Sequence, residues 1–241
     1  MHVLVLCSGT GSVDRAFERR NWEVTSVDWL AKFQPTLCVD ILEWDYQAAF
    51  PKGHFQFVWA SPACTHFSRA RTTGKTPRDL AGATALVARC LEIAEYFGCD
   101  WCLENPATGL LKRQPLMEGL AWADACYCKY GYEYRKQTRL WHSPAFGEVF
   151  RPRPVCCKAS PCPAFAAEGV HPRSAQRGAT RVRGGGRRQN DECSQAQLYS
   201  MPPELCDEIA LAAETCAEDK EDAAPEGEAG AGQHGQEAQG L

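Results

Sequence analysis

The stretch HVLVLCSGTGS (residues 2–12) decides the fold. A short apolar run stops at a glycine-rich turn, and Val13, Ala16 and Phe17 then have the spacing of a buried helix face. Such a strand–turn–helix unit suits a nucleoside ligand, because glycines admit the ligand and the helix start offers free N–H groups. It can also be a plain structural turn. Asp14 replaces the last glycine of the dinucleotide fingerprint, which disfavours a NAD-dependent oxidoreductase.

Apolar segments followed by polar residues recur along the first half of the chain. They are residues 22–27 before Asp28, 36–39 before Asp40, 55–60 before Ser61, and 99–103 before Glu104. Leu80–Phe97 has apolar residues at helical spacing. Strands alternating with helices predict an α/β, Rossmann-like, doubly wound and mostly parallel sheet. Ligands of such sheets bind beyond the carboxyl ends of the strands, so the polar residues there are candidate site residues.

The chain changes character after Trp141. We expect residues 1–142 to form the catalytic, cofactor-binding domain and residues 143–197, rich in Pro, Gly, Arg and Cys, to form a small irregular insert. Residues 198–216 contain a helical pattern and are expected to pack back on the first domain. Residues 217–241, rich in Gly, Ala and acids, are expected to be a disordered acidic tail.

The composition limits the class of protein. With 44% hydrophobic and 23% charged residues, it is that of a soluble globular protein. No apolar run reaches the roughly 20 residues of a membrane span. We therefore expect an intracellular protein, in the nucleus or in a host-cell cytoplasm depending on its source. The fourteen cysteines of this 241-residue chain do not indicate a secreted disulfide scaffold, because such scaffolds are short and poor in core residues.

Cys64 lies between a strand end and a basic loop containing Arg69, Arg71 and Lys75. Cations near a thiol favour the thiolate, which is the nucleophilic form. Taken alone, a cysteine at a strand end is more often a packing residue. Glu104 at the next strand end could face this thiol, and a nucleophile with a carboxylic acid suits attack on an aromatic ring.

In this order, the motifs resemble those of the cytosine-C5 DNA methyltransferases, over roughly residues 2–141 and 198–216. The short length fits a viral, phage or algal member. The similar motifs are the glycine turn, Asp28-Trp29, Asp40-Ile41, Ser61-Pro62-Ala63-Cys64, Glu104-Asn105-Pro106, Gln137-Thr138-Arg139 and residues 199–209. Ala63 departs from the family's Pro-Pro-Cys, and Pro106 departs from its Glu-Asn-Val.

The resemblance implies a cofactor, S-adenosylmethionine, and a mechanism. The implied cofactor-binding residues are Ser8, Gly9, Thr10, Gly11, Ser12, Asp28, Trp29, Asp40, Ile41 and Pro62. Cys64 would add to carbon 6 of cytosine, Glu104 would stabilise the ring at N3, and Arg139 would steady the base and that carboxylate. The base must be flipped out of a duplex or already single-stranded to be reached.

Two further sets of residues are candidates for DNA contact and for metal binding. Arg69, Arg71, Lys75, Gln137, Arg177 and Arg181 are expected to contact DNA, because basic side chains neutralise phosphates. In the resembling family, the region that recognises the target occupies the place of this insert. Cys156, Cys157, Cys162 and His171 could hold a structural zinc ion, with Cys126 or Cys128 as a substitute ligand.

Two other hypotheses stay open. A related enzyme would use the same cofactor to methylate cytosine in tRNA, and the arginine-rich stretch does not separate the two substrates. A catalytically silent nucleic-acid-binding relative is compatible with Ala63 and with the short insert.

Overall fold

The computed structural model describes residues 1–69, 76–173, 180–181, 187–188 and 198–223. Seven strands of this part form one sheet in the order β3-β2-β1-β4-β5-β7-β6. Their bounds are β1 His2–Leu6, β2 Glu23–Asp28, β3 Leu37–Cys38, β4 Phe57–Ala60, β5 Asp100–Pro106, β6 Trp122–Cys126 and β7 Gln137–His142. β7 pairs antiparallel with both of its neighbours, and the other pairs are parallel. β8 (Thr180–Arg181) and β9 (Arg187–Arg188) form a separate antiparallel pair.

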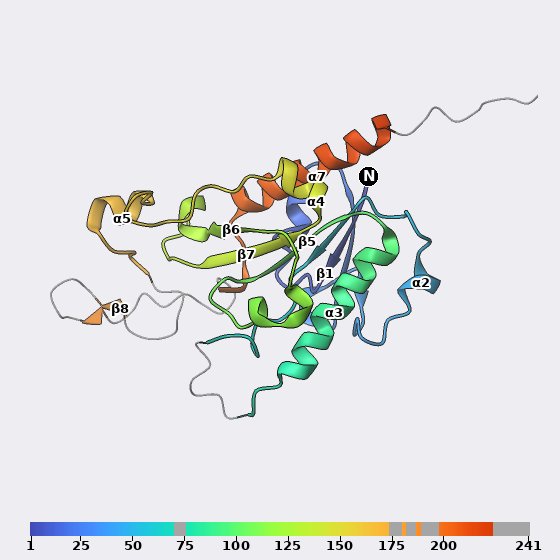
Figure 1. Ribbon diagram of the computed structural model, residues 1–241, viewed down its shortest axis with the longest axis horizontal. Coiled ribbons are helices and arrows are strands. Elements are labelled where there is room, and N and C mark those ends of the chain that lie inside the picture. The colour runs from blue at the N-terminus through green and yellow to red at the C-terminus, as the bar shows by residue number, and fades with distance from the viewer. Residues whose placement is uncertain (70–75, 174–179, 182–186, 189–197, 224–241) are drawn as a thin grey trace, which may run out of the picture.

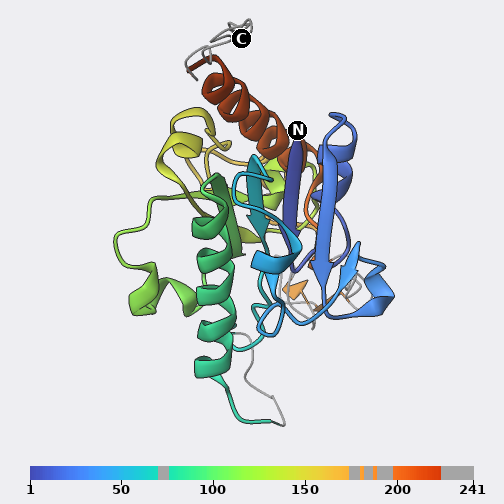
Figure 2. The same cartoon turned by 90° about the vertical axis from the view of Figure 1, so that its right-hand side faces the viewer.

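Helices cover both faces of the sheet (Figures 1 and 2). The helices are α1 Asp14–Glu18, α2 Tyr46–Ala49, α3 Leu80–Phe97, α4 Pro144–Val149, α5 Pro163–Glu168 and α7 Pro203–Ala223, with short 3₁₀ turns at η1 Ala31–Phe33, η2 Leu111–Arg113, η3 Pro115–Met117 and η4 Tyr127–Tyr130. α3 lies on one face, whereas α1, α4 and α7 pack together on the other. The predicted α/β, Rossmann-like and mostly parallel fold is confirmed.

The continuous apolar run of β1 is explained by burial on both faces. Val3 and Val5 pack toward α1 and α7, and the alternate residues Leu4 and Leu6 pack toward α3. Successive side chains of a strand point to opposite faces, so a central parallel strand covered by helices has no polar side. The position of β1 in the middle of the sheet brings the glycine turn to the centre of its carboxyl edge.

The last described helix is longer than the sequence predicted. α7 continues to Ala223, through residues that we had expected to begin a disordered tail. Cys216 and Ala217 are buried against the sheet, and Lys220 Nζ lies 2.8 Å from the buried carboxylate of Asp100. The tail beyond Ala223 lies outside the described residues. Within the described chain, the helices are too short or too polar to cross a membrane.

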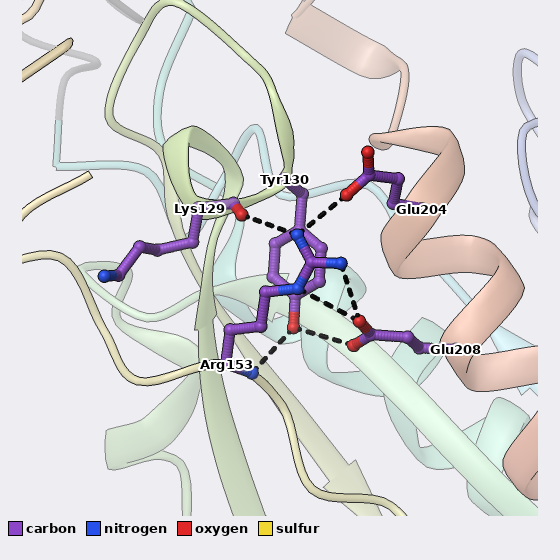
Figure 3. Close-up of polar contacts among 5 residues, drawn as sticks. All are labelled: Lys129, Tyr130, Arg153, Glu204 and Glu208. Carbon is purple, nitrogen blue, oxygen red and sulfur yellow. Dashed lines mark hydrogen bonds and ion pairs between the residues drawn. The ribbon is translucent and has the colours of Figure 1, made fainter. Parts of the chain in front are cut away.

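Arg153 fastens the start of the insert to two other elements (Figure 3). Its guanidinium donates to the carbonyl of Lys129 in η4 at 2.9 Å and to Glu204 in α7 at 2.7 Å. It also donates to Glu208 at 3.1 Å and stacks 4.5 Å from the centre of the Tyr130 ring. The Tyr130 hydroxyl donates to Glu208 at 3.0 Å. This network fixes the insert, η4 and α7 to one another.

Candidate active site

A cavity of about 640 Å³ opens at the carboxyl edge of the parallel strands, a size that suits a cofactor. Most of the predicted site residues line it: Ser8, Gly9, Thr10, Ser12, Asp28, Trp29, Asp40, Ile41, Pro62, Cys64 and Glu104. Gly11, Arg69, Gln137 and Arg139 are not part of its lining. Two residues preceding α7, Tyr199 and Met201, complete the wall. Segments far apart in the sequence therefore meet around one space.

The glycine turn bends sharply at this edge. Cys7, Gly9 and Gly11 have φ values of 55°, 53° and 66°, in the left-handed region that glycine adopts most easily. The amide of Gly9 donates to one carboxylate oxygen of Asp28 at 3.0 Å, and the amide of Leu30 donates to the other at 2.9 Å. Asp28 is buried, so it also holds the turn against the end of β2.

Apolar side chains also line the cavity. Trp29 is 70% exposed although it lines the cavity, and Ile41, another lining residue, is buried. Asp40 accepts the amide of Leu42 at 3.0 Å, which shapes the loop after β3. An exposed indole at a cavity provides a flat apolar surface on which a planar ring can stack.

The loop that carries Cys64 is anchored to β5. The buried side-chain amide of Asn105 donates to the carbonyl of Pro62 at 2.9 Å. The carbonyl of Cys64 accepts the amides of Phe67 at 3.0 Å and Ser68 at 2.9 Å, which closes a tight turn. Phe67 is fully buried beneath it. The partly buried thiol is therefore held at a fixed place on the cavity wall.

Glu104 enters the cavity from the neighbouring strand. Ala60 of β4 lies opposite Leu103 of β5, so Ser61 and Glu104, the next residues in sequence, reach the same edge. β5 itself continues to Pro106, beyond the end at residue 103 that the sequence predicted. The Thr138 hydroxyl donates to the Glu104 carboxylate, and the Ser61 hydroxyl approaches it at 3.5 Å. The carboxylate is only 8% exposed. Its orientation is set by neutral hydroxyls rather than by a cation.

The expected role of Arg139 is corrected by the structure. Its guanidinium binds Asp124 at 2.8 and 3.1 Å and stacks on Trp122 at 3.4 Å. Gln137 also donates to Asp124, at 3.2 Å. Side chains alternate along a strand, so Thr138 points to Glu104 while its neighbours Gln137 and Arg139 point to the other face. Gln137-Thr138-Arg139 therefore resembles the family motif in residue order, but the side chain of Arg139 lies on the strand face away from Glu104.

Lys136 is a cavity residue that the sequence analysis missed. It shares the strand face of Thr138, and its ammonium donates to the carbonyl of Leu198 at 3.0 Å and to the Tyr127 hydroxyl at 3.4 Å. The ammonium also lies 4.6 Å from the centre of the Tyr127 ring. Counting residues two apart from Thr138 would have pointed to Lys136, because that spacing keeps one strand face.

The electrostatic surroundings of Cys64 oppose its ionisation. Burial raises the pKa of the thiol most strongly, and the nearby Glu104 carboxylate raises it further. Lys136 lowers the pKa of the same thiol. We had expected the basic loop to favour the thiolate; the cation that acts on it here is Lys136. Arg69 is exposed, whereas Arg71 and Lys75 lie outside the described residues.

The remaining predicted residues belong to the insert. Arg177 lies outside the described residues, and Arg181 is in β8, where only the backbone is described. Cys156, Cys162 and His171 come together as predicted, but the fourth member of their group is Cys128, from η4. Cys157 is exposed and is not part of this group.

Comparison with known proteins identifies one viral relative. The chain is 35% identical over 176 residues to the probable DNA (cytosine-5)-methyltransferase of Frog virus 3 (isolate Goorha), a match covering 68% of this chain and 78% of that protein. No family model matches the chain.

Two solved structures are similar at lower identity. A mutant of DNMT2 from Spodoptera frugiperda matches with a TM-score of 0.39 and 18% identity, over 58% of this chain and 49% of that one. The Dnmt2 methyltransferase of S. pombe matches with a TM-score of 0.45 and 15% identity, over 66% and 57%. The chain thus spans about half the length of these two structures.

Proposed function

The chain belongs to the cytosine-5 DNA methyltransferase family, and we propose that it transfers a methyl group from S-adenosylmethionine to carbon 5 of cytosine in DNA. The observation that carries this proposal is the presence of Cys64 and Glu104 in one cavity with the glycine turn. The thiol is the nucleophile, the carboxyl group is the acid, and the turn with Trp29 receives the methyl donor.

Cys64 overcomes the low reactivity of the ring. Carbon 5 of cytosine is a weak nucleophile, and addition of the Cys64 thiolate to carbon 6 turns the ring into an enamine whose carbon 5 is reactive. S-adenosylmethionine, when bound, supplies an electrophilic methyl group. Once the carbon 5 proton has been lost to a base, Cys64 is eliminated and the aromatic ring is restored.

Glu104 and Lys136 assist that addition in different ways. Glu104 holds N3 of the base and stabilises the ring as the thiolate adds, and Thr138 and Ser61 fix its orientation. Lys136 favours the thiolate of Cys64 electrostatically and so offsets part of the effect of burial. We assign to Lys136 and Thr138 the supporting part that the resemblance gave to Arg139.

The residues around the glycine turn fit an adenosine-type cofactor. The nearest atom to a Cβ added at Gly9 would be the carbonyl oxygen of Cys7, at 3.9 Å, which leaves room beside the turn. The exposed indole of Trp29 is suited to stack on a purine, and Asp28 is suited to accept from a ribose. We assign cofactor binding to these residues with Ser8, Thr10, Gly11, Ser12, Asp40, Ile41 and Pro62.

The nucleic acid must present its base outside a duplex stack, either flipped out or single-stranded. We assign the catalytic role to residues 1–142 with α7, and contact with the target to the insert of residues 143–197. We assign phosphate binding to Arg69, Arg71, Lys75, Arg177 and Arg181. Free thiols at this density suit the reducing interior of a cell, in the nucleus or cytoplasm of a host.

Methyl transfer can be tested directly with the full chain. Labelled S-adenosylmethionine is incubated with double-stranded DNA, single-stranded DNA and tRNA, and the nucleosides released by digestion are identified by mass spectrometry. We expect labelled 5-methyldeoxycytidine from DNA and none with C64A. Label only in the cytidine of tRNA would overturn the proposed substrate, and no label in any nucleic acid would overturn the proposed activity.

A further inference from the structure

Four potential metal ligands converge at a distance from the catalytic cavity. The sulfur atoms of Cys128, Cys156 and Cys162 and a ring nitrogen of His171 all lie within 4.8 Å of one another. His171 Nε2 is 3.6 Å from Cys156 Sγ and 3.4 Å from Cys162 Sγ. Tetrahedral zinc, with Zn–S near 2.3 Å and Zn–N near 2.0–2.1 Å, requires sulfur–nitrogen separations of about 3.6 Å. The two observed sulfur–nitrogen separations therefore match two edges of a zinc tetrahedron.

We propose that Cys128, Cys156, Cys162 and His171 bind one structural zinc ion. The three cysteines are almost completely buried, at 4%, 2% and 1% exposure, and His171 is partly buried. A site with four protein ligands has no open coordination position for water. It is therefore structural rather than catalytic.

Backbone amides support two of the sulfur atoms. The amide of Cys162 donates to Cys156 Sγ at 3.3 Å, and the amide of Phe165 donates to Cys162 Sγ at 3.4 Å. Such donors stabilise the negative charge that cysteine carries as a metal ligand, and they orient the sulfur. Lys129 reaches across from η4 and donates to Ser160 Oγ and to the carbonyl of Pro161, both at 3.0 Å. The loop between the two cysteines is thus held in place.

The local core is too small to explain this arrangement by hydrophobic packing. The buried members of this cluster in the described chain are four cysteines, and only Val155, Ala164 and Phe165 pack on them, partly buried. Pairing two of the sulfurs in a disulfide would leave the imidazole nitrogen, which approaches both Cys156 and Cys162, without a function. A metal ion uses all four groups and supplies the folding free energy that so few apolar side chains lack.

The zinc ion would join the insert to the rim of the catalytic cavity. Cys128 directly follows Tyr127, a cavity residue, and the other three ligands come from the insert. Just beyond His171, Arg173 forms an ion pair with Glu133 at 2.9 Å, and its amide donates to the Glu133 carbonyl at 3.2 Å. Zinc would therefore set the position from which the arginine-rich part of the insert departs.

Metal content tests the site independently of methyl transfer. The full chain is produced in zinc-supplemented cells, purified without chelator, and analysed for zinc per chain by mass spectrometry. We expect one zinc ion in the wild type and in Cys157→Ser, the matched control in which the exposed neighbouring cysteine is replaced. Cys156→Ser and Cys162→Ser should lose it. A metal-free wild type, or equal loss in Cys157→Ser, would overturn the proposal.

A second measurement distinguishes ligation from misfolding. Cobalt(II) in place of zinc should give the intense visible absorption of a tetrahedral thiolate site. His171→Cys should keep a bound metal and change this spectrum, whereas His171→Ala should weaken binding. Cys126→Ser replaces the fourth buried thiol of the cluster, 3.4 Å from Cys128 Sγ, and should leave the spectrum unchanged. An octahedral wild-type spectrum, an unchanged spectrum in His171→Cys, or loss of metal in Cys126→Ser would contradict the ligand set.

Discussion

The cavity and the cysteine–histidine group use the same side chain in opposite ways. At the cavity, one thiol, Cys64, stands beside a carboxylate and an ammonium group and faces an open space. Where the insert meets η4, three buried thiols and a partly buried imidazole face one another. Local surroundings therefore decide whether a cysteine is suited to attack a substrate or to hold a metal.

The largest effect is expected at the nucleophile. Cys64→Ala should reduce kcat for methyl transfer by at least about a thousandfold, because the variant lacks the thiol that forms the covalent bond to carbon 6. Zinc content should not change. Cys157→Ser, which removes an exposed thiol outside both regions, serves as the control and should keep full activity. Comparable losses in the two variants would mean that the thiol at Cys64 has no special role.

Replacing the carboxyl group should have the next largest effect. Glu104→Gln should lower kcat about 10²–10⁴-fold, the range that general acid–base groups contribute. Thr138→Val, which removes only the hydroxyl that orients Glu104, should cost about tenfold. Steady-state rates with saturating DNA measure both. An equal loss in both variants would indicate disruption of the strand rather than loss of the acid.

Removing the metal should affect stability rather than chemistry at Cys64. Treatment with a chelator should lower the free energy of unfolding by several kcal/mol, because zinc binding contributes directly to folding. Thermal unfolding with and without chelator measures this shift, and Cys64→Ala should show the same shift as the wild type. If chelator left the unfolding temperature of the wild type unchanged, the claim that a metal stabilises the fold would be contradicted.

A smaller effect is expected in the pH dependence of the rate. Because burial and Glu104 raise the pKa of Cys64, the thiolate is the minor form at neutral pH, and kcat/KM should rise with increasing pH. Lys136→Met removes the group that lowers this pKa, so the rising limb should move to higher pH and the neutral-pH rate should fall about tenfold. If the rising limb of the pH–rate profile of Lys136→Met coincided with that of the wild type, Lys136 would be excluded as the cation that lowers the pKa of Cys64.

The smallest catalytic effect is expected at Arg139. Arg139→Met should destabilise the fold by about 1–3 kcal/mol, because it leaves the partly buried Asp124 without its cation. The shape of the pH–rate profile should stay that of the wild type. Chemical denaturation measures the loss of stability, and the pH dependence of kcat/KM shows whether the profile is unchanged. A shifted profile in Arg139→Met would restore the role that the sequence motif assigned to it.

The parallel half of the sheet could be predicted from the sequence, and the antiparallel half could not. Strands such as β1 are continuously apolar because helices cover both faces, and a polar residue such as Asp28 of β2 marks the strand end. Helix α3 has the bounds that its periodicity gave. In β7, side chains one residue apart point to opposite faces of the sheet. The order of residues 137–139 therefore did not reveal that Thr138, not Arg139, points to Glu104.

The cysteine–histidine group could also be predicted only in part from the sequence. Three of its residues, Cys156, Cys162 and His171, are close in sequence and were predicted together. The fourth is Cys128 of η4, which the sequence offered only as a substitute, together with Cys126. Cys157, which the sequence favoured because it is adjacent to Cys156, is exposed and lies outside the group. Tertiary packing between η4 and the insert, which no spacing rule encodes, decides between these cysteines.

The central claim is that Cys64 forms a covalent bond to the cytosine ring, and trapping of that adduct tests it most directly. DNA containing 5-fluorocytosine is incubated with the protein and S-adenosylmethionine, since fluorine at carbon 5 blocks the final elimination. Mass spectrometry of the digested complex should then locate the modified nucleotide on the peptide containing Cys64, and Cys64→Ala should give no adduct. An adduct on another residue, or no adduct with the wild-type protein, would contradict the account.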